Sequence, residues 1–315
     1  NPSRSCDYLK IENTDIETTA AWSGVQYIAR NGANATTLGL LKIDATVRSV
    51  GAALRIAPNS SADTGATIDR LVVRGDMQSS GSYEAVQIAK AAAAYVGITG
   101  SAEFNGRFRA PGAASCMSLA GTSTAPAKFG GEFQTDGNGY RPIDSQMFGD
   151  VTVLPGTTLK GTVTPFRSRF ANSGGLYLDT VTIDGAFTAA FEAGSGPTEV
   201  MQSNVRRING AGAATSLPAR SFTRRNSDGT VVAHSTAAPA SGTWAVGDKV
   251  ENTTKTAGGV DYWTCVSAGT PGTWVATYLP IAVTATLDFP SIAAAGQQEL
   301  TVTVTGAATG DAVRL

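Results

Sequence analysis

The stretch Leu71-Val72-Val73-Arg74-Gly75 decides the fold, because its pattern recurs along most of the chain. Its first and third residues are apolar, and a glycine follows two positions later. In an extended strand this alternation puts both apolar side chains on one face. Glycine allows the positive φ that a sharp corner requires. Each such stretch therefore predicts a strand followed by a bend.

Seven related stretches, some with another small residue in place of the glycine, start at Leu9, Leu41, Val96, Ala127, Val151, Val181 and Arg206. Together with Leu71, the starts are separated by 32, 30, 25, 31, 24, 30 and 25 residues. A loose period of this length is typical of solenoids. Helical periodicity is scarce over the same region, which disfavours leucine-rich, ankyrin and tetratricopeptide repeats. We therefore predict an all-β fold in which residues 1–215 form a parallel β-helix of eight coils. A β-sandwich is the alternative, since short alternating strands suit both folds.

Composition excludes several classes of function. Charged residues make up 16%, and 24 Lys and Arg nearly balance 25 Asp and Glu, so we expect neither nucleic-acid binding nor a polybasic lipid-binding patch. No apolar stretch reaches the length of a membrane span, so we expect no membrane insertion. Three widely separated cysteines and one histidine, His234, predict no disulfide framework, no metal site and no cofactor. The single histidine also disfavours Ser/His/Asp and Cys/His hydrolases.

The organisation changes after residue 215. Residues 216–279 are rich in Trp and Gly and predict a compact β module with Gly-Gly and Pro-Gly turns. Its aromatic side chains are expected to form a small core or to pack against a neighbouring chain. Residues 280–315 contain alternating strand-like runs and predict the start of a C-terminal β domain, and we expect both ends of the sequence to be cut.

Two segments carry a resemblance to a known family. Gly242-Thr243-Trp244 with Val246-Gly247-Asp248, followed by Trp263 to Trp274, resembles the module after the β-helix in bacteriophage tailspikes and related proteins of the pectate-lyase superfamily. Residues 285–313 resemble the opening of the C-terminal β domain of phage tail fibres. The resemblance covers residues 238–315 by motif and residues 1–215 by architecture alone.

The resemblance implies a homotrimer of right-handed parallel β-helices. It also implies a location on the virion tail, outside the cell, with contacts to other tail proteins and to bacterial surface polysaccharide. Many members cleave that polysaccharide, so the leading hypothesis is a receptor-binding tailspike that binds and depolymerises capsule or lipopolysaccharide. The alternatives are an adhesive tail fibre without catalysis and a secreted polysaccharide lyase resembling pectate lyase.

Cleavage of a glycoside by hydrolysis requires two carboxyl groups with different protonation states. The loop around Gly137-Asn138-Gly139 offers several, and we expect Asp136 and Asp144 to be the acid and base. Tyr140 and Arg141 would position the sugar, and Trp22 would be a platform on which a sugar ring stacks. Further catalytic candidates are Glu132, Asp150 and Asp179, the last two as part of a row with Asp184 on adjacent coils. Ordinary turn chemistry and solvated corner positions are the competing interpretations of these carboxylates.

Overall fold

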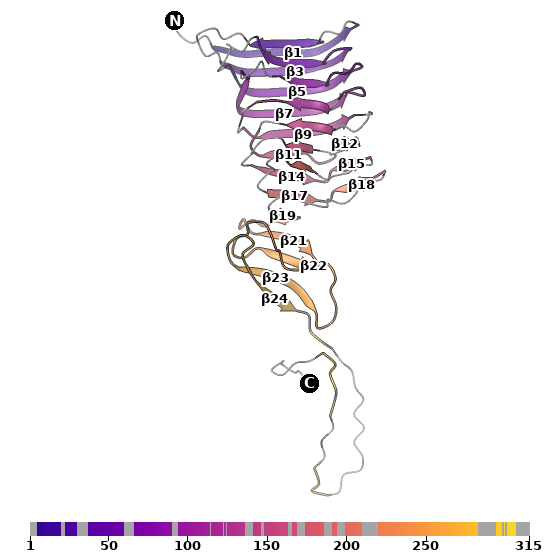
Figure 1. Cartoon of the computed structure of the whole chain (residues 1–315), viewed down its shortest axis with the longest axis vertical. Coiled ribbons are helices and arrows are strands. Elements are labelled where there is room, and N and C mark those ends of the chain that lie inside the picture. The colour runs from indigo at the N-terminus through magenta and orange to yellow at the C-terminus, as the bar shows by residue number, and fades with distance from the viewer. Residues whose placement is uncertain are drawn as a thin grey trace. The chain divides into compact units, whose positions relative to one another are not determined.

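The computed structural model describes most of the chain in two units, Asn1–Arg224 and Arg225–Leu315 (Figure 1). The described residues are 5–19, 23–29, 37–59, 66–89, 94–113, 115–121, 123, 125–135, 141–145, 148–162, 166–168, 174–185, 191–193, 199–209, 220–282, 294–297, 299 and 301–306. They contain strands and no helix.

The first unit is a solenoid of parallel strands that belong to two sheets. The main path of the long sheet runs through β1 (Ser5–Thr18), β3 (Thr37–Ser49), β5 (Thr67–Ser79), β7 (Gly97–Arg109), β9 (Ala127–Gln134), β11 (Val151–Val153), β14 (Gly175–Asp179), β17 (Glu199–Ser203) and β19 (Arg220–Phe222). Beside this path, β12 (Thr158–Lys160), β15 (Thr182–Asp184) and β18 (Arg206–Ile208) pair with one another, and β12 also pairs with β9. Consecutive strands of the path are separated in sequence by a strand of the other sheet or of this side branch, as in a parallel β-helix.

The short sheet closes the coils on another side. Its order is β16 (Phe191–Ala193), β13 (Phe166–Ser168), β10 (Arg141–Ser145), β8 (Ser115–Leu119), β6 (Val86–Ile88), β4 (Leu54–Pro58) and β2 (Val25–Ala29). The pairs of both sheets in this unit are parallel, which confirms the predicted parallel β-helix and shows that the β-sandwich alternative is wrong. Handedness and oligomeric state stay predictions.

The register explains both the success and the error of the repeat pattern. Leu9 pairs with Leu41 and Leu41 with Leu71, as the pattern predicts. The next partners are Ala102, Ala127, Val151, Leu176 and Val200, so the starts placed at Val96, Val181 and Arg206 are wrong. Val181 immediately precedes β15, which belongs to a second limb of the coil. Both limbs cover the same core, and therefore both carry the apolar alternation.

A glycine marks the bend between the two limbs. Gly75 and Gly131 have φ values of +103° and +96°, in the left-handed region that L side chains rarely adopt. Up to β9, the chain passes through this bend within one long strand. In later coils the limbs are separate strands, β11 and β12 for example.

Columns of apolar side chains fill the interior of the solenoid. One column contains Val47, Met77, Phe108, Phe133 and Leu159, all fully buried and paired in register. Such columns bury apolar surface between neighbouring coils, so each coil is stabilised mainly by the coils beside it.

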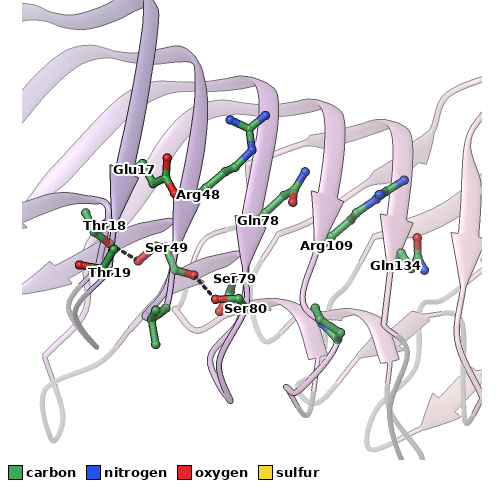
Figure 2. Close-up of a pocket in the computed structure, with 12 residues that line it drawn as sticks. Glu17, Thr18, Thr19, Arg48, Ser49, Gln78, Ser79, Ser80, Arg109 and Gln134 are labelled. Atoms are coloured by element: carbon green, nitrogen blue, oxygen red, sulfur yellow. Dashed lines mark hydrogen bonds between the residues drawn. The ribbon is translucent and has the colours of Figure 1, made fainter.

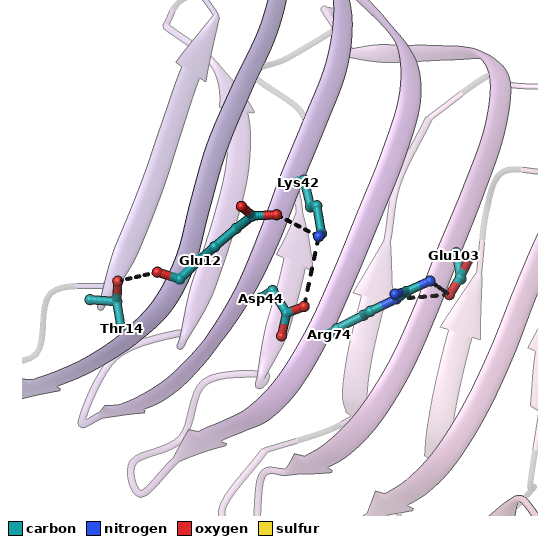
Figure 3. Close-up of polar contacts among 6 residues, drawn as sticks. All are labelled: Glu12, Thr14, Lys42, Asp44, Arg74 and Glu103. Atoms are coloured by element: carbon teal, nitrogen blue, oxygen red, sulfur yellow. Dashed lines mark hydrogen bonds and ion pairs between the residues drawn. The ribbon is translucent and has the colours of Figure 1, made fainter.

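The outer face of the first limb carries paired charges (Figure 3). Lys42 Nζ lies 2.5 Å from Glu12 Oε1, and Arg74 contacts Glu103 Oε1 at 2.7 Å. These pairs join neighbouring coils at exposed positions, where one ion pair contributes at most about 1 kcal/mol. They are therefore ordinary surface contacts of the solenoid.

The second unit is built on a small mixed sheet. It contains β20 (Arg224–Arg225), β21 (Val231–Ser235), β22 (Lys249–Asn252), β23 (Val260–Ser267) and β24 (Thr273–Tyr278) in that order. β21 and β22 are parallel, whereas β22, β23 and β24 are joined as antiparallel hairpins. Trp244 is 6% exposed and meets Trp274 edge to face at 5.2 Å, so one tryptophan belongs to the core of this unit.

The domain boundaries after residues 215 and 279 stay predictions. Residues 210–219 lie outside the described residues. Between 280 and 315, the described residues 280–282, 294–297, 299 and 301–306 contain no strand. The predicted C-terminal β domain therefore stays a hypothesis.

Candidate functional site

A row of polar side chains crosses the outer face of the long sheet. Arg48 pairs with Gln78, Gln78 with Arg109, and Arg109 with Gln134. Each follows a core residue of the Val47 column by one position, so each points outward. Glu17 precedes Arg48 in the same row. Figure 2 shows these side chains extending from successive strands.

This row borders a groove, here called the polar groove, with a volume of about 500 Å³. Its lining residues are Glu17, Thr18, Thr19, Arg48, Ser49, Val50, Gln78, Ser79, Ser80, Arg109, Pro111 and Gln134 (Figure 2). Only Val50 and Pro111 of this set are apolar. The groove spans five strands, which corresponds to roughly 19 Å along the stacking direction at about 4.8 Å per strand.

Hydroxyl groups form a second layer of the groove. Thr18 Oγ1 and Ser49 Oγ lie 2.8 Å apart, and the Ser80 amide donates to the Ser49 carbonyl at 2.8 Å. Ser49 and Ser79 are 3% and 1% exposed. The contacts to Ser49 therefore join three successive coils through hydrogen bonds.

The charged groups around the groove are only partly paired. Arg109 Nη2 lies 3.2 Å from Glu132 Oε1. Gln78 Nε2 donates to both carboxylate oxygens of Asp76 at 3.0 Å. Among the described residues, no ion pair is formed by the exposed Arg48. Arg48 is therefore available to an anionic group.

Two buried atoms of the groove lack hydrogen-bond partners. In the part of the chain that the structure describes, three buried side-chain polar atoms are unsatisfied, namely Arg55 Nε, Ser79 Oγ and Arg109 Nε. Two of these residues, Ser79 and Arg109, line the polar groove. Unsatisfied buried polar atoms are rare in folded proteins, and a missing water or ligand is one cause. Two residues of the groove lining thus each carry one buried polar atom without a partner among the described residues.

The proposed catalytic loop is only partly described. Asp136, Tyr140 and Trp22 lie outside the described residues. Asp144 lies on β10 of the short sheet and is 3% exposed. Arg141 begins the same strand. Glu132 lies on β9 of the long sheet, where it contacts Arg109 and so borders the polar groove.

The row of carboxylates proposed for adjacent coils is not aligned by the register. Asp150 Oδ1 accepts a hydrogen bond from the Gly175 amide at 2.8 Å, at the start of β14. Asp179 ends that strand and pairs with Ser203. Asp184 belongs to β15 and pairs with Lys160. The three carboxylates therefore occupy different corners of their coils.

A carboxylate that sequence reasoning missed lies near Asp144. Burial raises the pKa of Glu84, and the negative charge of Asp144 raises it further. Gln87 Nε2 donates to Glu84 Oε2 at 3.1 Å. Gln87 and Asp144 are both paired with Ser118, one from each side. Glu84, which precedes β6, is thus brought close to Asp144 on β10.

The residues of the polar groove were also missed by the sequence analysis, although a signal existed. Two ladders of paired residues run across the same four strands with a constant offset of seven residues. The first contains Leu41, Leu71, Ala102 and Ala127, and the second contains Arg48, Gln78, Arg109 and Gln134. The start placed at Val96 hid this constant offset. A register taken from Ala102 reveals the polar row.

Among the described residues, no cluster of three or more His, Cys, Asp or Glu side chains could hold a metal ion. The described part of the chain also has no helix with the length and apolar character that a membrane crossing requires. Comparison with protein-family models, with curated proteins and with solved structures finds no match to this chain.

Proposed function

We propose that this chain is the receptor-binding part of a bacteriophage tailspike or tail fibre, and that it binds bacterial surface polysaccharide in the polar groove. The observation that carries the proposal is the groove itself, an elongated site of about 500 Å³ whose lining residues other than Val50 and Pro111 have polar side chains. Its hydroxyl, amide and guanidinium groups match the hydroxyl-rich surface of a glycan. The motifs at 242–274 support the biological setting.

The orientation of the groove suits a linear polymer. Its lining residues come from successive coils, so an extended chain that lies along it crosses the strands and meets equivalent positions on each. A single small sugar would leave most of this length empty. An oligosaccharide of several residues is therefore the better ligand.

Assembly as a homotrimer on the virion tail is part of the proposal. Four large apolar side chains of the second unit are 49% to 63% exposed, namely Val246, Val266, Val275 and Tyr278. An interface between chains would cover exposed apolar side chains such as these. We expect light scattering of the intact chain to give a trimeric mass, and a monomeric mass would contradict this part of the proposal.

Cleavage of the bound polysaccharide is a second candidate function. It is supported by the proximity of Glu84 to Asp144, because hydrolysis needs two carboxyl groups and burial raises the pKa of Glu84. Asp136 and Asp144 remain the predicted pair, and Glu84 is a third candidate. A purely adhesive fibre would bind polysaccharide without cleaving it. A secreted lyase would cleave polysaccharide without being part of a virion.

One experiment separates these functions. The chain is incubated with capsule and lipopolysaccharide preparations from a panel of bacterial strains, and bound and shortened glycans are measured. Binding with depolymerisation supports the tailspike, and binding without it supports the adhesive fibre. A new ultraviolet absorbance from an unsaturated uronate supports the lyase. Failure to bind any preparation would contradict the proposed function.

Variants locate the site. Arg109→Gln should weaken glycan binding about tenfold, since a charge-assisted hydrogen bond is lost. Arg70→Gln removes an exposed positive charge from β5 outside the groove and should leave binding unchanged. Equal effects of the two substitutions would show that the groove is not the binding site.

A further inference from the structure

Cations recur on every second strand along the polar row. The row through the polar groove continues past Gln134 to Lys160 and Asp184, because β12 pairs with both β9 and β15. In order, the row is Glu17, Arg48, Gln78, Arg109, Gln134, Lys160 and Asp184. Cations thus occupy every second strand, with glutamines between them and an acid at each end.

The neighbouring outward row strengthens this alternation. Two residues before Gln78 and Gln134 stand the acids Asp76 and Glu132, on the same strands as the glutamines. Two residues before Arg109 stands Arg107, on the same strand as that arginine. When the two rows are taken together, β3, β7 and β12 are cationic, whereas β1, β5, β9 and β15 are acidic.

Contacts within the fold explain only part of this pattern. Arg107 faces Asp76 at 3.5 Å, and Arg109 faces Glu132 at 3.2 Å. Arg48 and Lys160 form no ion pair among the described residues. Arg109 also has its Nε atom unsatisfied. Arg48 and Lys160 therefore keep their donors for an external anion, and Arg109 keeps the guanidinium donors that Glu132 does not occupy, although its buried Nε is out of reach.

The spacing of the cations identifies the class of ligand. Two strand spacings separate Arg48 from Arg109, which is roughly 9.6 Å. A pyranose in an extended glycan is about as long as one strand spacing, so a disaccharide is about as long as two. A carboxylate on every second sugar would then meet each cation in turn, and neutral sugars would lie over the glutamines and the acids.

We infer that the polar groove selects an acidic polysaccharide in which charged and neutral sugars alternate, an inference that rests on the proposed function. The guanidinium groups of Arg48 and Arg109 bind carboxylates through paired hydrogen bonds. Asp76 on β5 and Glu132 on β9 repel a negative charge on a sugar that lies over their own strands. This repulsion provides the selectivity for neutral sugars at these positions. The row from Arg48 to Lys160, which leaves the groove after Gln134, would hold about five sugar residues, one for each strand from β3 to β12.

The test uses glycans with different charge spacing. Binding of the intact chain is measured for hyaluronan, with a carboxylate on every second sugar, for polygalacturonate, with one on every sugar, and for neutral dextran. Hyaluronan should bind at least about tenfold more tightly than polygalacturonate, and dextran should not bind detectably.

Substitutions in the row should change this preference. Arg48→Gln should weaken hyaluronan binding about tenfold. Gln78→Arg places a cation on β5, between Arg48 on β3 and Arg109 on β7. It should shift the preference towards polygalacturonate. The control is Arg70→Gln. It removes one positive charge, as Arg48→Gln does, but from a position on β5 outside the groove. It should leave both affinities unchanged.

Three results would overturn the inference. Equal affinities for hyaluronan and polygalacturonate, or a preference that Gln78→Arg leaves unchanged, would show that charge spacing is not recognised. Tighter binding of single-stranded DNA, lost in Arg48→Gln, would assign the row to polyanions in general. If bacterial capsules still bind in the groove in these cases, the proposed function stands. If no bacterial polysaccharide binds, the proposed function fails as well.

Discussion

Phe108 and Phe133 stack on neighbouring coils with ring centroids 4.9 Å apart and planes 7° from parallel. Both side chains are fully buried. They directly precede Arg109 and Gln134, two outward residues of the polar row. The core column thus fixes the positions from which the groove is built.

Phe108→Ala should destabilise the solenoid by about 3–5 kcal/mol, since it removes a buried ring and leaves a cavity. Chemical denaturation followed by circular dichroism measures the change. The exposed aromatic Tyr83, at 46% exposure, provides the control. Tyr83→Ala should change stability by less than about 0.5 kcal/mol. Similar effects of the two substitutions would contradict the packing described for Phe108.

Gly131→Ala should disrupt the bend between the two limbs. Gly131 has a φ of +96°, and a Cβ there would overlap the carbonyl oxygen of Gly106 on the preceding coil. Gly156 has a φ of +80° with no atom within 4 Å of its Cβ position, so Gly156→Ala adds strain without the overlap. We expect a cost of about 1 kcal/mol for Gly156→Ala and clearly more for Gly131→Ala. Thermal unfolding midpoints of both variants test this order.

The second unit depends on one buried carboxylate. Asp248 is fully buried and accepts hydrogen bonds from the amides of Val231 at 3.0 Å and Ala245 at 2.8 Å. Asp248→Ala leaves these donors unsatisfied and should destabilise the unit by about 2–5 kcal/mol. Because Trp244, Trp263 and Trp274 lie in this unit, tryptophan fluorescence should report its unfolding. An unchanged fluorescence transition would contradict this role of Asp248.

Glu84 should make stability depend on pH. Its pKa is raised in the folded chain, first by burial and then by the charge of Asp144. A carboxyl group whose folded pKa is raised holds its proton more tightly in the folded state. Its effect on stability is therefore absent below the ordinary value of 4.5 and becomes unfavourable as pH rises through the folded pKa.

Glu84→Gln should remove this loss, so the difference in stability between the variant and the wild type should shift in favour of the variant as pH rises. Unfolding midpoints of both proteins, measured at a series of pH values, provide the comparison. A constant difference across the series would contradict the raised pKa.

The sequence predicted the architecture better than the site. Alternation at Leu41 and Leu71 reports directly which face of a strand is buried, and these two residues pair as expected. The limb to which a repeat belongs is not encoded in its own five residues. For this reason Val181 and Arg206 were placed in the wrong column, whereas Val96 lies just before the first limb of its coil. The error is physical, because both limbs need the same apolar pattern to cover one core.

Sequence reasoning looked for the site in a loop, whereas the described structure offers a groove across strands. Glycine-rich carboxylate loops are locally visible in a sequence, as around Asp144. Arg48 and Arg109 are 61 residues apart in the chain, and only the register brings them into one row. Likewise, Glu84 and Asp144 become neighbours only through the ladder of the short sheet. Sites assembled by stacking therefore need the register before they can be recognised.

The most direct test of the central claim is amide hydrogen exchange of the chain with and without a bacterial polysaccharide that it binds. Binding in the polar groove should slow exchange in the segments around Glu17–Thr19, Arg48–Val50, Gln78–Ser80 and Arg109–Pro111, which come from successive coils. Exchange in the second unit should remain unchanged. Protection confined to Val231–Tyr278, with the four groove segments unaffected, would contradict the account.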